Sequence, residues 1–386
     1  MTEMVHGPLP VEVREAIIPR WWRTVDRWTM ASVLFLFVLG IILALAASPP
    51  LAERNGLPAF HYVERQALFG VLALIAMIIT SMMAPSTVRR WATVAFGFAL
   101  VSVVLLPIFG TDFGKGATRW YSLGFASVQP SEFIKPAFVV FAAWLIAASF
   151  EPDGPPGRLM SFAAAITIAG FLALQPDFGQ ASLILFAWAV MYFSAGAPLL
   201  LILLMAGASV FAGMIAYNNS EHFARRIDGY LSANVDPTTQ LGYAEDAIRE
   251  GGLFGVGPGE GSVKWSLPDA HTDFIIAVAA EEYGMIMVLL ILGLFCFIVL
   301  RTLVRLLHER DLFVRLAGTG LVAVFGVQAM INIGVAVRLL PAKGMTLPFV
   351  SYGGSSLIAG GIALGMILAF TRNRPQGALS SAIRGY

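Results

Sequence analysis

Apolar runs long enough to cross a lipid bilayer dominate the chain. Such runs, of about 17 to 27 residues, recur along it, and 58% of all residues are hydrophobic. A transmembrane helix needs about 20 predominantly apolar residues to cross a hydrocarbon core of about 30 Å, and soluble domains do not carry many such segments. The sequence therefore predicts an all-α, polytopic membrane protein. Ten spans are expected, near residues 28–47, 67–83, 91–108, 131–149, 159–174, 179–194, 199–217, 272–300, 313–337 and 349–370.

The polar segments divide the chain into three parts. Residues 1–26 are predicted to form a cytoplasmic tail, 27–371 the ten-helix membrane domain and 372–386 a second cytoplasmic tail. The one large loop, 218–271, is expected on the opposite, extracytoplasmic side. Its segment 222–231 places apolar and charged residues on different helical faces, as in a helix that lies on a membrane surface.

Lys and Arg residues set the expected orientation. With the N-terminus in the cytoplasm, fourteen of them lie on that side and ten outside, or six outside if the long loop is left out. Positively charged residues favour the cytoplasmic side of a membrane protein. We therefore expect both termini in the cytoplasm. Cys296 is the one cysteine, so the chain has no internal disulfide.

The stretch from Trp265 to Gly284 is the most informative part of the chain. It opens with polar residues and continues into the apolar run 272–300. One helix over that run would be roughly 44 Å long, against a hydrocarbon core of about 30 Å. Because Arg301 and Arg305 mark its other end, the polar start must stand outside the bilayer. Asp273 is then expected in the first helical turn, at the mouth of a span. It could meet a polar substrate there, or it could only cap the helix.

Three further polar features precede or follow spans. Glu132 and Lys135 lie three residues apart at the start of one, where ionisable groups indicate either a site or a helix-pairing ion pair. Asp177 occupies a tight turn, which usually reflects turn chemistry alone. The glycine-dense segment 255–261 resembles an anion-binding nest, and it follows no strand that would make it a dinucleotide-binding loop. The sequence has no Walker loop and no cysteine and histidine cluster that would bind a metal.

Several motifs stand in a fixed order between about residues 27 and 372. They are Gln129-Pro-Ser-Glu with Lys135, Gln175-Pro-Asp, Pro268-Asp-Ala-His-Thr-Asp-Phe, Glu281-Glu-Tyr-Gly, Pro341-Ala-Lys-Gly-Met-Thr-Leu-Pro and Ser351-Tyr-Gly-Gly-Ser-Ser. Together they resemble the SEDS family (shape, elongation, division and sporulation proteins of bacteria). Within it, Ala270-His-Thr-Asp-Phe and the motif that begins at Pro341 resemble the division branch, FtsW, more than the elongation branch, RodA.

The resemblance implies an inverting peptidoglycan glycosyltransferase. Such an enzyme polymerises lipid II, an undecaprenyl-diphosphate-linked disaccharide-peptide, at the outer face of the plasma membrane. Asp273 matches the family's essential aspartate, and a carboxylate general base suits the attack of a sugar hydroxyl. A bound Mg²⁺ or Mn²⁺ could help to neutralise the diphosphate. The other candidate substrate-binding residues are Arg119, Glu132, Lys135, Arg225, Arg226, Lys264, His271, Ser351 and Tyr352.

Two other classes of function stay open at this point. A lipid II flippase would also need charged groups within the membrane. It would need them through the middle of the bundle, whereas the charges of this sequence are expected in its outer third. A scaffold that recruits division proteins would explain the tails but not the outer basic residues. For the polymerase, the resemblance implies a class B penicillin-binding transpeptidase and other division proteins as partners. Nucleic acid is not expected as a partner.

Overall fold

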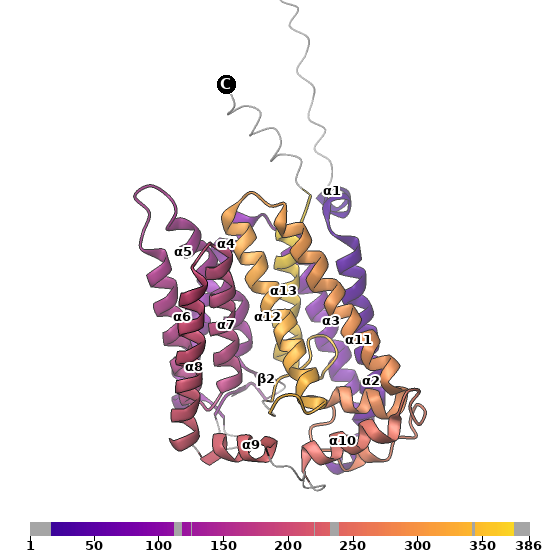
Figure 1. Cartoon of the computed structure of the whole chain (residues 1–386). Coiled ribbons are helices and arrows are strands. Elements are labelled where there is room, and N and C mark those ends of the chain that lie inside the picture. Colours follow the sequence, from indigo (N-terminus) through magenta and orange to yellow (C-terminus); the bar gives the residue numbers. More distant parts are fainter. Residues whose placement is uncertain are drawn as a thin grey trace, which may run out of the picture.

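The computed structural model describes residues 17–111, 118–124, 126–219, 221–231, 239–341 and 344–373. Figure 1 shows long helices packed side by side, with the short helices α9 and α10 at the end away from the termini and the short helix α1 at the other. Two short strands before α5, of two residues each, pair Tyr121 with Val128, and an isolated bridge joins Thr111 to Trp120; the other described elements are helical, as predicted. The elements are α1 (Ile17–Thr24), α2 (Arg27–Arg54), α3 (His61–Met82), α4 (Pro85–Phe109), β1 (Tyr121–Ser122), β2 (Ser127–Val128), α5 (Pro130–Ala148), α6 (Gly157–Leu174), α7 (Phe178–Ser194), α8 (Leu199–Asn219), α9 (Glu221–Leu231), α10 (Gln240–Gly251), the 3₁₀ turn η1 (Val263–Trp265), α11 (Ile275–Leu307), α12 (Leu312–Ala336) and α13 (Gly354–Phe370).

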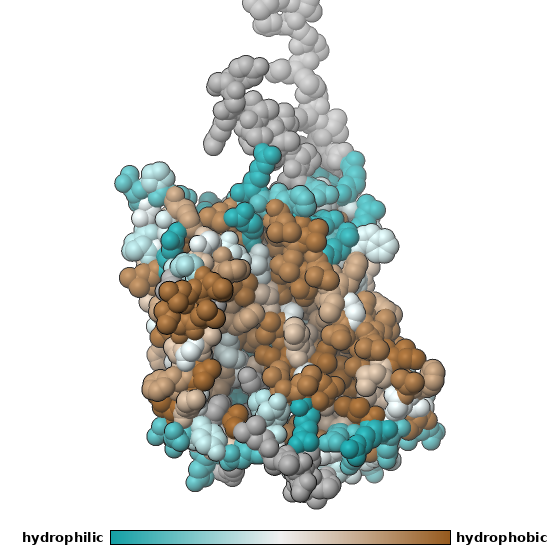
Figure 2. Space-filling view, viewed as in Figure 1, coloured by the Kyte–Doolittle hydropathy of each residue, from teal (hydrophilic) through white to brown (hydrophobic). Residues whose placement is uncertain are grey.

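Every predicted span coincides with a helix, and the polytopic character of the chain is confirmed. Within the described residues, seven helices are long and apolar enough to cross a membrane: α2, α3, α4, α5, α6, α11 and α12. α7 and α13 are apolar and 17 residues long, and the total of ten spans stays a prediction. Figure 2 shows hydrophobic side chains in a broad band across the middle of the molecule and hydrophilic ones at both ends. This is the surface expected of a protein that exposes its middle to lipid.

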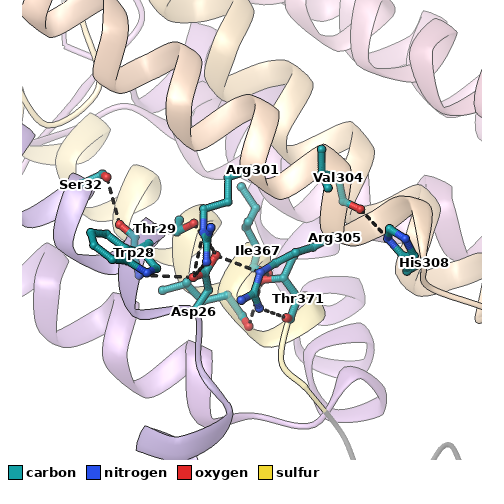
Figure 3. Close-up of polar contacts among 11 residues, drawn as sticks. Asp26, Trp28, Thr29, Ser32, Arg301, Val304, Arg305, His308, Ile367 and Thr371 are labelled. Carbon is teal, nitrogen blue, oxygen red and sulfur yellow. Dashed lines mark hydrogen bonds and ion pairs between the residues drawn. The ribbon is translucent and has the colours of Figure 1, made fainter.

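The end that carries the termini is held by ion pairs around Asp26 (Figure 3). The Asp26 side chain is 2% exposed and pairs with Arg301 Nε at 2.7 Å and Arg305 Nε at 3.1 Å. Asp26 also caps α2 by accepting hydrogen bonds from the Trp28 amide and the Thr29 hydroxyl. Burial alone would raise its pKa, but these hydrogen bonds and the two arginine charges outweigh burial and lower the pKa below its usual value.

The first described residues belong to the bundle, although the sequence placed them in a polar tail. In α1, Trp21 is buried and its Nε1 donates a hydrogen bond to the Ser81 hydroxyl at 2.9 Å. Thr24 accepts hydrogen bonds from Arg372 Nε and from the Asn373 amide, both at 3.1 Å. The N- and C-terminal segments therefore meet at one end of the molecule, as an even number of spans requires.

α11 is not one straight helix, because its backbone breaks at Gly284. Gly284 has φ 76° and ψ −178°, a conformation that essentially only glycine adopts. The turn 251–257 packs backbone to backbone against this break. A Cβ on Gly284 would lie 2.2 Å from the Leu253 carbonyl oxygen, and one on Gly255 would lie 2.2 Å from the Glu282 carbonyl oxygen. Glycine is therefore needed on both sides of the contact.

The same turn supplies the hydrogen bonds that the broken helix loses. The Val256 and Gly257 amides donate to the carbonyls of Glu281 and Glu282, at 2.8 and 3.1 Å. In return, the Met285 amide donates to the Gly252 carbonyl at 3.0 Å. The glycine-dense segment was interpreted from the sequence as an anion nest. For the amides of Val256 and Gly257 that interpretation is wrong, because they already donate to helix carbonyls.

Candidate functional site

A cavity of about 870 Å³ opens at the end of the bundle opposite the termini. Its walls come from the ends of α2, α3, α5, α12 and α13 that lie away from the termini, from the β1–β2 hairpin and from the turn before α11. Of the residues predicted from the sequence, it brings together Asp273, Arg119, Glu132, His271 and Tyr352. Residues far apart in the chain therefore share one polar chamber, of a size that suits a ligand.

Asp273 stands just outside α11 rather than in its first turn. The helix begins at Ile275, and its N-cap residue is Phe274, which makes no side-chain capping hydrogen bond. A tight turn precedes it, in which the Asp269 carbonyl accepts the amides of Thr272 and Asp273. A capping side chain belongs to the N-cap residue, and Asp273 precedes that residue. The structure therefore does not support the alternative that Asp273 only caps the helix.

The Asn332 side chain links the backbone of Asp273 to the loop that leads to α13. Asn332 on α12 donates from Nδ2 to the Asp273 carbonyl at 3.1 Å and to the Met345 carbonyl at 2.6 Å. Gly344 has φ +66°, and a Cβ there would lie 3.7 Å from Asp273 Oδ2. The carboxylate therefore lies beside the loop that leads to α13, and all four residues line the cavity.

Arg119 brings a positive charge to the cavity. Its Nε donates to the Gln175 carbonyl at 3.0 Å and its Nη2 to the Pro176 carbonyl at 2.6 Å. These bonds use two of the five N–H donors of a guanidinium. Asp177 also lines the cavity and is 6% exposed. Burial raises the pKa of Asp177 above its usual value, and the Arg119 charge opposes that rise in part.

Glu132 and Lys135 form the expected ion pair, at 2.9 Å, and both side chains are nearly inaccessible. Glu132 Oε1 accepts a hydrogen bond from Gln180 at 2.7 Å, and Lys135 Nζ donates to Gln328 Oε1 at 2.8 Å. Glu132 lines the main cavity, whereas Lys135 is not among its lining residues. Glu132 therefore forms part of the cavity wall, and Lys135 lies behind it in α5.

His271 and Tyr352 lie together with Tyr62, a residue that the sequence did not single out. The three rings are in mutual contact, with centroids 5.3 to 5.5 Å apart. Asn55 donates to the Tyr62 hydroxyl at 2.8 Å, and Arg65 contacts the Tyr352 hydroxyl. Burial raises the pKa of Tyr352, and Arg65 partly offsets this. Arg65 is thus a second cation at the cavity, on a different wall from Arg119.

Two other candidates from the sequence, Lys264 and Ser351, do not line this cavity. Lys264 is buried and forms an ion pair with Glu282, so its ammonium group already has an anionic partner. Ser351 is 2% exposed and accepts a hydrogen bond from the Leu347 amide at 2.9 Å. Arg225 and Arg226 belong to α9, and their side chains lie outside what the structure describes.

Sequence reasoning missed the two amides of α12, Gln328 and Asn332. They are spaced four residues apart, so they share one face of an otherwise apolar helix. That spacing was the available signal, because a polar pair on one face of a membrane helix usually meets another polar group. Tyr62 and Arg65 gave no such signal, since both stand in a mixed segment before an apolar run.

The described residues contain no group of three or more His, Cys, Asp or Glu side chains placed to hold a metal ion. Asp273, Asp269, Asp177 and Glu132 all line the cavity, but as separate carboxylates. A Mg²⁺ ion usually takes only one or two protein carboxylates and completes its shell with water and phosphate oxygens. The donor set therefore does not fit a resident, all-protein metal site.

Comparison with known proteins identifies relatives of this chain. The chain is similar to a protein of Caulobacter vibrioides named "Probable peptidoglycan glycosyltransferase FtsW", with 42% identity over 92% of this chain and 91% of that one. It is 34% identical to "Stage V sporulation protein E" of Bacillus subtilis, over 88% of this chain and 94% of that one.

Solved structures share the fold. A chain of a peptidoglycan synthase complex, described as coordinating polymerization and crosslinking, matches with a TM-score of 0.73 and 26% identity, over 90% of this chain and 97% of that chain. The rod shape determining protein RodA of Thermus thermophilus matches with a TM-score of 0.66 and 26% identity, over 91% and 97%. The family model for the FtsW, RodA and SpoVE proteins, described as "Cell cycle protein", matches residues 27–376. This chain belongs to that family.

Proposed function

We propose that this protein is a peptidoglycan glycosyltransferase that polymerises lipid II into glycan strands at the outer face of the plasma membrane, during septal wall synthesis. The observation that carries the proposal is Asp273, which faces a polar cavity beside two arginines at one end of a membrane bundle. The names of the similar proteins, most of them FtsW, support the glycosyltransferase class and the division role.

The proposed reaction transfers a glycosyl group with inversion. The oxygen of a sugar hydroxyl forms a bond to the anomeric carbon of a second, lipid-linked sugar. The bond from that carbon to the diphosphate oxygen breaks, and undecaprenyl diphosphate leaves. Asp273 accepts the hydroxyl proton, because an alcohol is a poor nucleophile at neutral pH without a base in hydrogen-bond reach.

Arg119 and Arg65 are the candidates for holding the diphosphate. A guanidinium binds phosphate oxygens through paired N–H donors, and its charge opposes the negative charge that develops on the leaving group. Both side chains line the same cavity as Asp273. A divalent cation would supply further positive charge there, bound by the diphosphate together with one carboxylate.

The position of buried charges favours the polymerase over the flippase. Among the described residues, Asp26 is the buried charged side chain at the termini end. At the cavity end the buried charged side chains are Glu132, Lys135, Asp177, Lys264, Glu281 and Glu282. A flippase would need polar groups along the path between these two ends, and a buried charge there would be costly without function.

Partner and location are part of the same proposal. The similar chain in a complex that couples polymerization with crosslinking supports a class B penicillin-binding transpeptidase as partner. The family and the apolar helices support the inner membrane. We propose cytoplasmic termini and a septal position; tagged protein at midcell would support the latter, and tagged protein along the lateral wall would favour an elongation role.

Replacing Asp273 with asparagine tests the mechanism. Asparagine keeps the size and hydrogen-bonding shape of aspartate but cannot accept the proton, so Asp273→Asn should lose about 10²- to 10⁴-fold in polymerisation rate. The measurement is glycan chain formation from lipid II by the purified protein with its transpeptidase partner, alongside the thermal unfolding temperature.

The matched control is Glu260→Gln, which removes an exposed carboxylate of the same loop that does not line the cavity. It should polymerise lipid II at the wild-type rate. An Asp273→Asn protein that is folded and polymerises near the wild-type rate would exclude Asp273 as the base. A wild-type protein with no polymerase activity in that complex would count against the function itself.

A further inference from the structure

In the turn that follows α10, every residue other than glycine is apolar and exposed. Leu253, Phe254 and Val256 are 66%, 79% and 42% exposed, and every other residue of 251–257 is glycine. Adjacent large apolar side chains on an outward turn are costly in water, at about 25 cal/mol for each Å² of apolar surface. Such a patch indicates a surface that contacts an apolar partner.

Several backbone groups of this turn are hydrogen-bonded within the protein. Its amides at Gly255, Val256 and Gly257 all donate to carbonyls, at 2.7 to 3.1 Å. The carbonyls of Gly252 and Leu253 accept the amides of α11 that the break at Gly284 frees. Backbone polar groups can enter lipid only when they are hydrogen-bonded within the protein, and these groups meet that condition.

The contacts with α11 also fix the depth of the turn. At the termini end, Arg301 pairs with Asp26 just before α2 begins, which marks one boundary of the bilayer. Arg301 follows Gly284 by seventeen positions along α11, a rise of about 26 Å at 1.5 Å per residue. The hydrocarbon core is about 30 Å thick. The turn therefore lies at the level where the outer leaflet meets water.

The apolar surface of the turn continues the outer face of α11. Ile286 and Leu289, in the first turns after the break, are 53% and 58% exposed. The Ile286 amide reaches the Leu253 carbonyl at 3.4 Å, so the turn adjoins that face directly. An exposed face of a membrane span is lipid-facing by default, and the turn extends it outward without a gap.

We propose that Leu253, Phe254 and Val256 form a wedge that inserts into the outer leaflet of the bilayer. The wedge anchors the turn 251–257, and through it the break in α11 and the short helical segment that leads back to Asp273. The lipid surface thus sets the height at which the cavity stands above the membrane. This inference concerns the resting protein and does not depend on the reaction assigned to it.

Spin labels measure the insertion directly. The full chain carries Cys296→Ala and one new cysteine, Leu253→Cys or Phe254→Cys, with a nitroxide attached, in vesicles of phosphatidylcholine and phosphatidylglycerol. Oxygen concentrates in lipid, whereas a neutral nickel chelate stays in water. At both positions the label should collide several-fold more with oxygen than with nickel.

Ser262→Cys is the matched control, because Ser262 is exposed in the same extramembrane region and outside the apolar patch. Its label should show the reverse preference. A second test adds Phe254→Asp to the label at 253; the charge should shift that label toward the behaviour of 262, whereas Phe254→Trp should leave it unchanged. Labels at 253 and 254 that prefer nickel would overturn the proposal. So would labels shielded from both reagents, which would mean that protein covers the patch.

Discussion

At the scale of single residues, the buried ion pair of α5 is tied to the cavity through its hydrogen bonds. Glu132 is bound by Gln180 on one side and by Lys135 on the other, and Lys135 continues the chain of contacts to Gln328. Each charged atom thus has a specific polar partner, as a buried pair requires if it is to repay its desolvation.

The contacts continue from Gln328 toward the candidate base. Gln328 Nε2 donates to the Thr346 carbonyl at 3.0 Å, and one turn further along α12 Asn332 holds the neighbouring Met345 carbonyl and that of Asp273. The ion pair and Asp273 are therefore linked through one face of α12. This geometry favours a positioning role for Lys135, since its ammonium is directed at Gln328 rather than at the main cavity.

Removing one charge of the pair should cost much more than removing both. Lys135→Met leaves the Glu132 carboxylate buried without its cation, and breaking a buried ion pair in this way costs about 3–5 kcal/mol. The double variant Glu132→Gln, Lys135→Met removes both charges and keeps an acceptor for Gln180, so most of that stability should return. The measurement is the thermal unfolding temperature of each variant in one detergent. A double variant as unstable as Lys135→Met would show that the pair is not the source of the effect.

At the scale of elements, the break in α11 should tolerate glycine alone. In Gly284→Ala, the new Cβ meets the Leu253 carbonyl oxygen at 2.2 Å. The backbone conformation itself also costs about 1–3 kcal/mol for a residue other than glycine. We expect a clear fall in unfolding temperature together with a fall in polymerisation, because the segment beyond the break carries Asp273.

Gly293→Ala provides the control within the same helix. Gly293 has helical geometry, and an added Cβ meets nothing within 4 Å. Alanine there should be neutral or stabilise by up to about 1 kcal/mol. Equal effects of the two substitutions, by thermal unfolding and by polymerisation of lipid II, would contradict the assignment of Gly284 as a required break.

At the scale of the whole molecule, the sequence predicted what depends on neighbours along the chain. The helices follow from run length and hydropathy, although α4 begins at Pro85, six residues before the predicted span, with the proline at the first helical position that it favours. Asp273 and Arg119 could be nominated from local polarity and motif, and the structure places both at one cavity.

Contacts between distant segments could not be predicted in that way. Lys264 looked like an available outer cation, but it pairs with Glu282, 18 residues further along the chain. The apolar run, interrupted only by Glu281 and Glu282, did not predict the break at Gly284, because the turn that stabilises the break lies about thirty residues earlier. Such pairings depend on tertiary packing, which hydropathy and periodicity do not encode.

The orientation of the whole bundle is the last prediction. Ser262 and His308 are both exposed, and they lie at opposite ends of the molecule, on either side of the span 285–307. In a Cys296→Ala background, Ser262→Cys should react with a membrane-impermeant maleimide on spheroplasts, and His308→Cys should react only after permeabilisation. The physical reason is the excess of Lys and Arg at the end that carries the termini. The reverse labelling would place the cavity in the cytoplasm. Asp273 would then face the side on which lipid-linked sugars are made rather than polymerised, and the proposed function would fail with the topology.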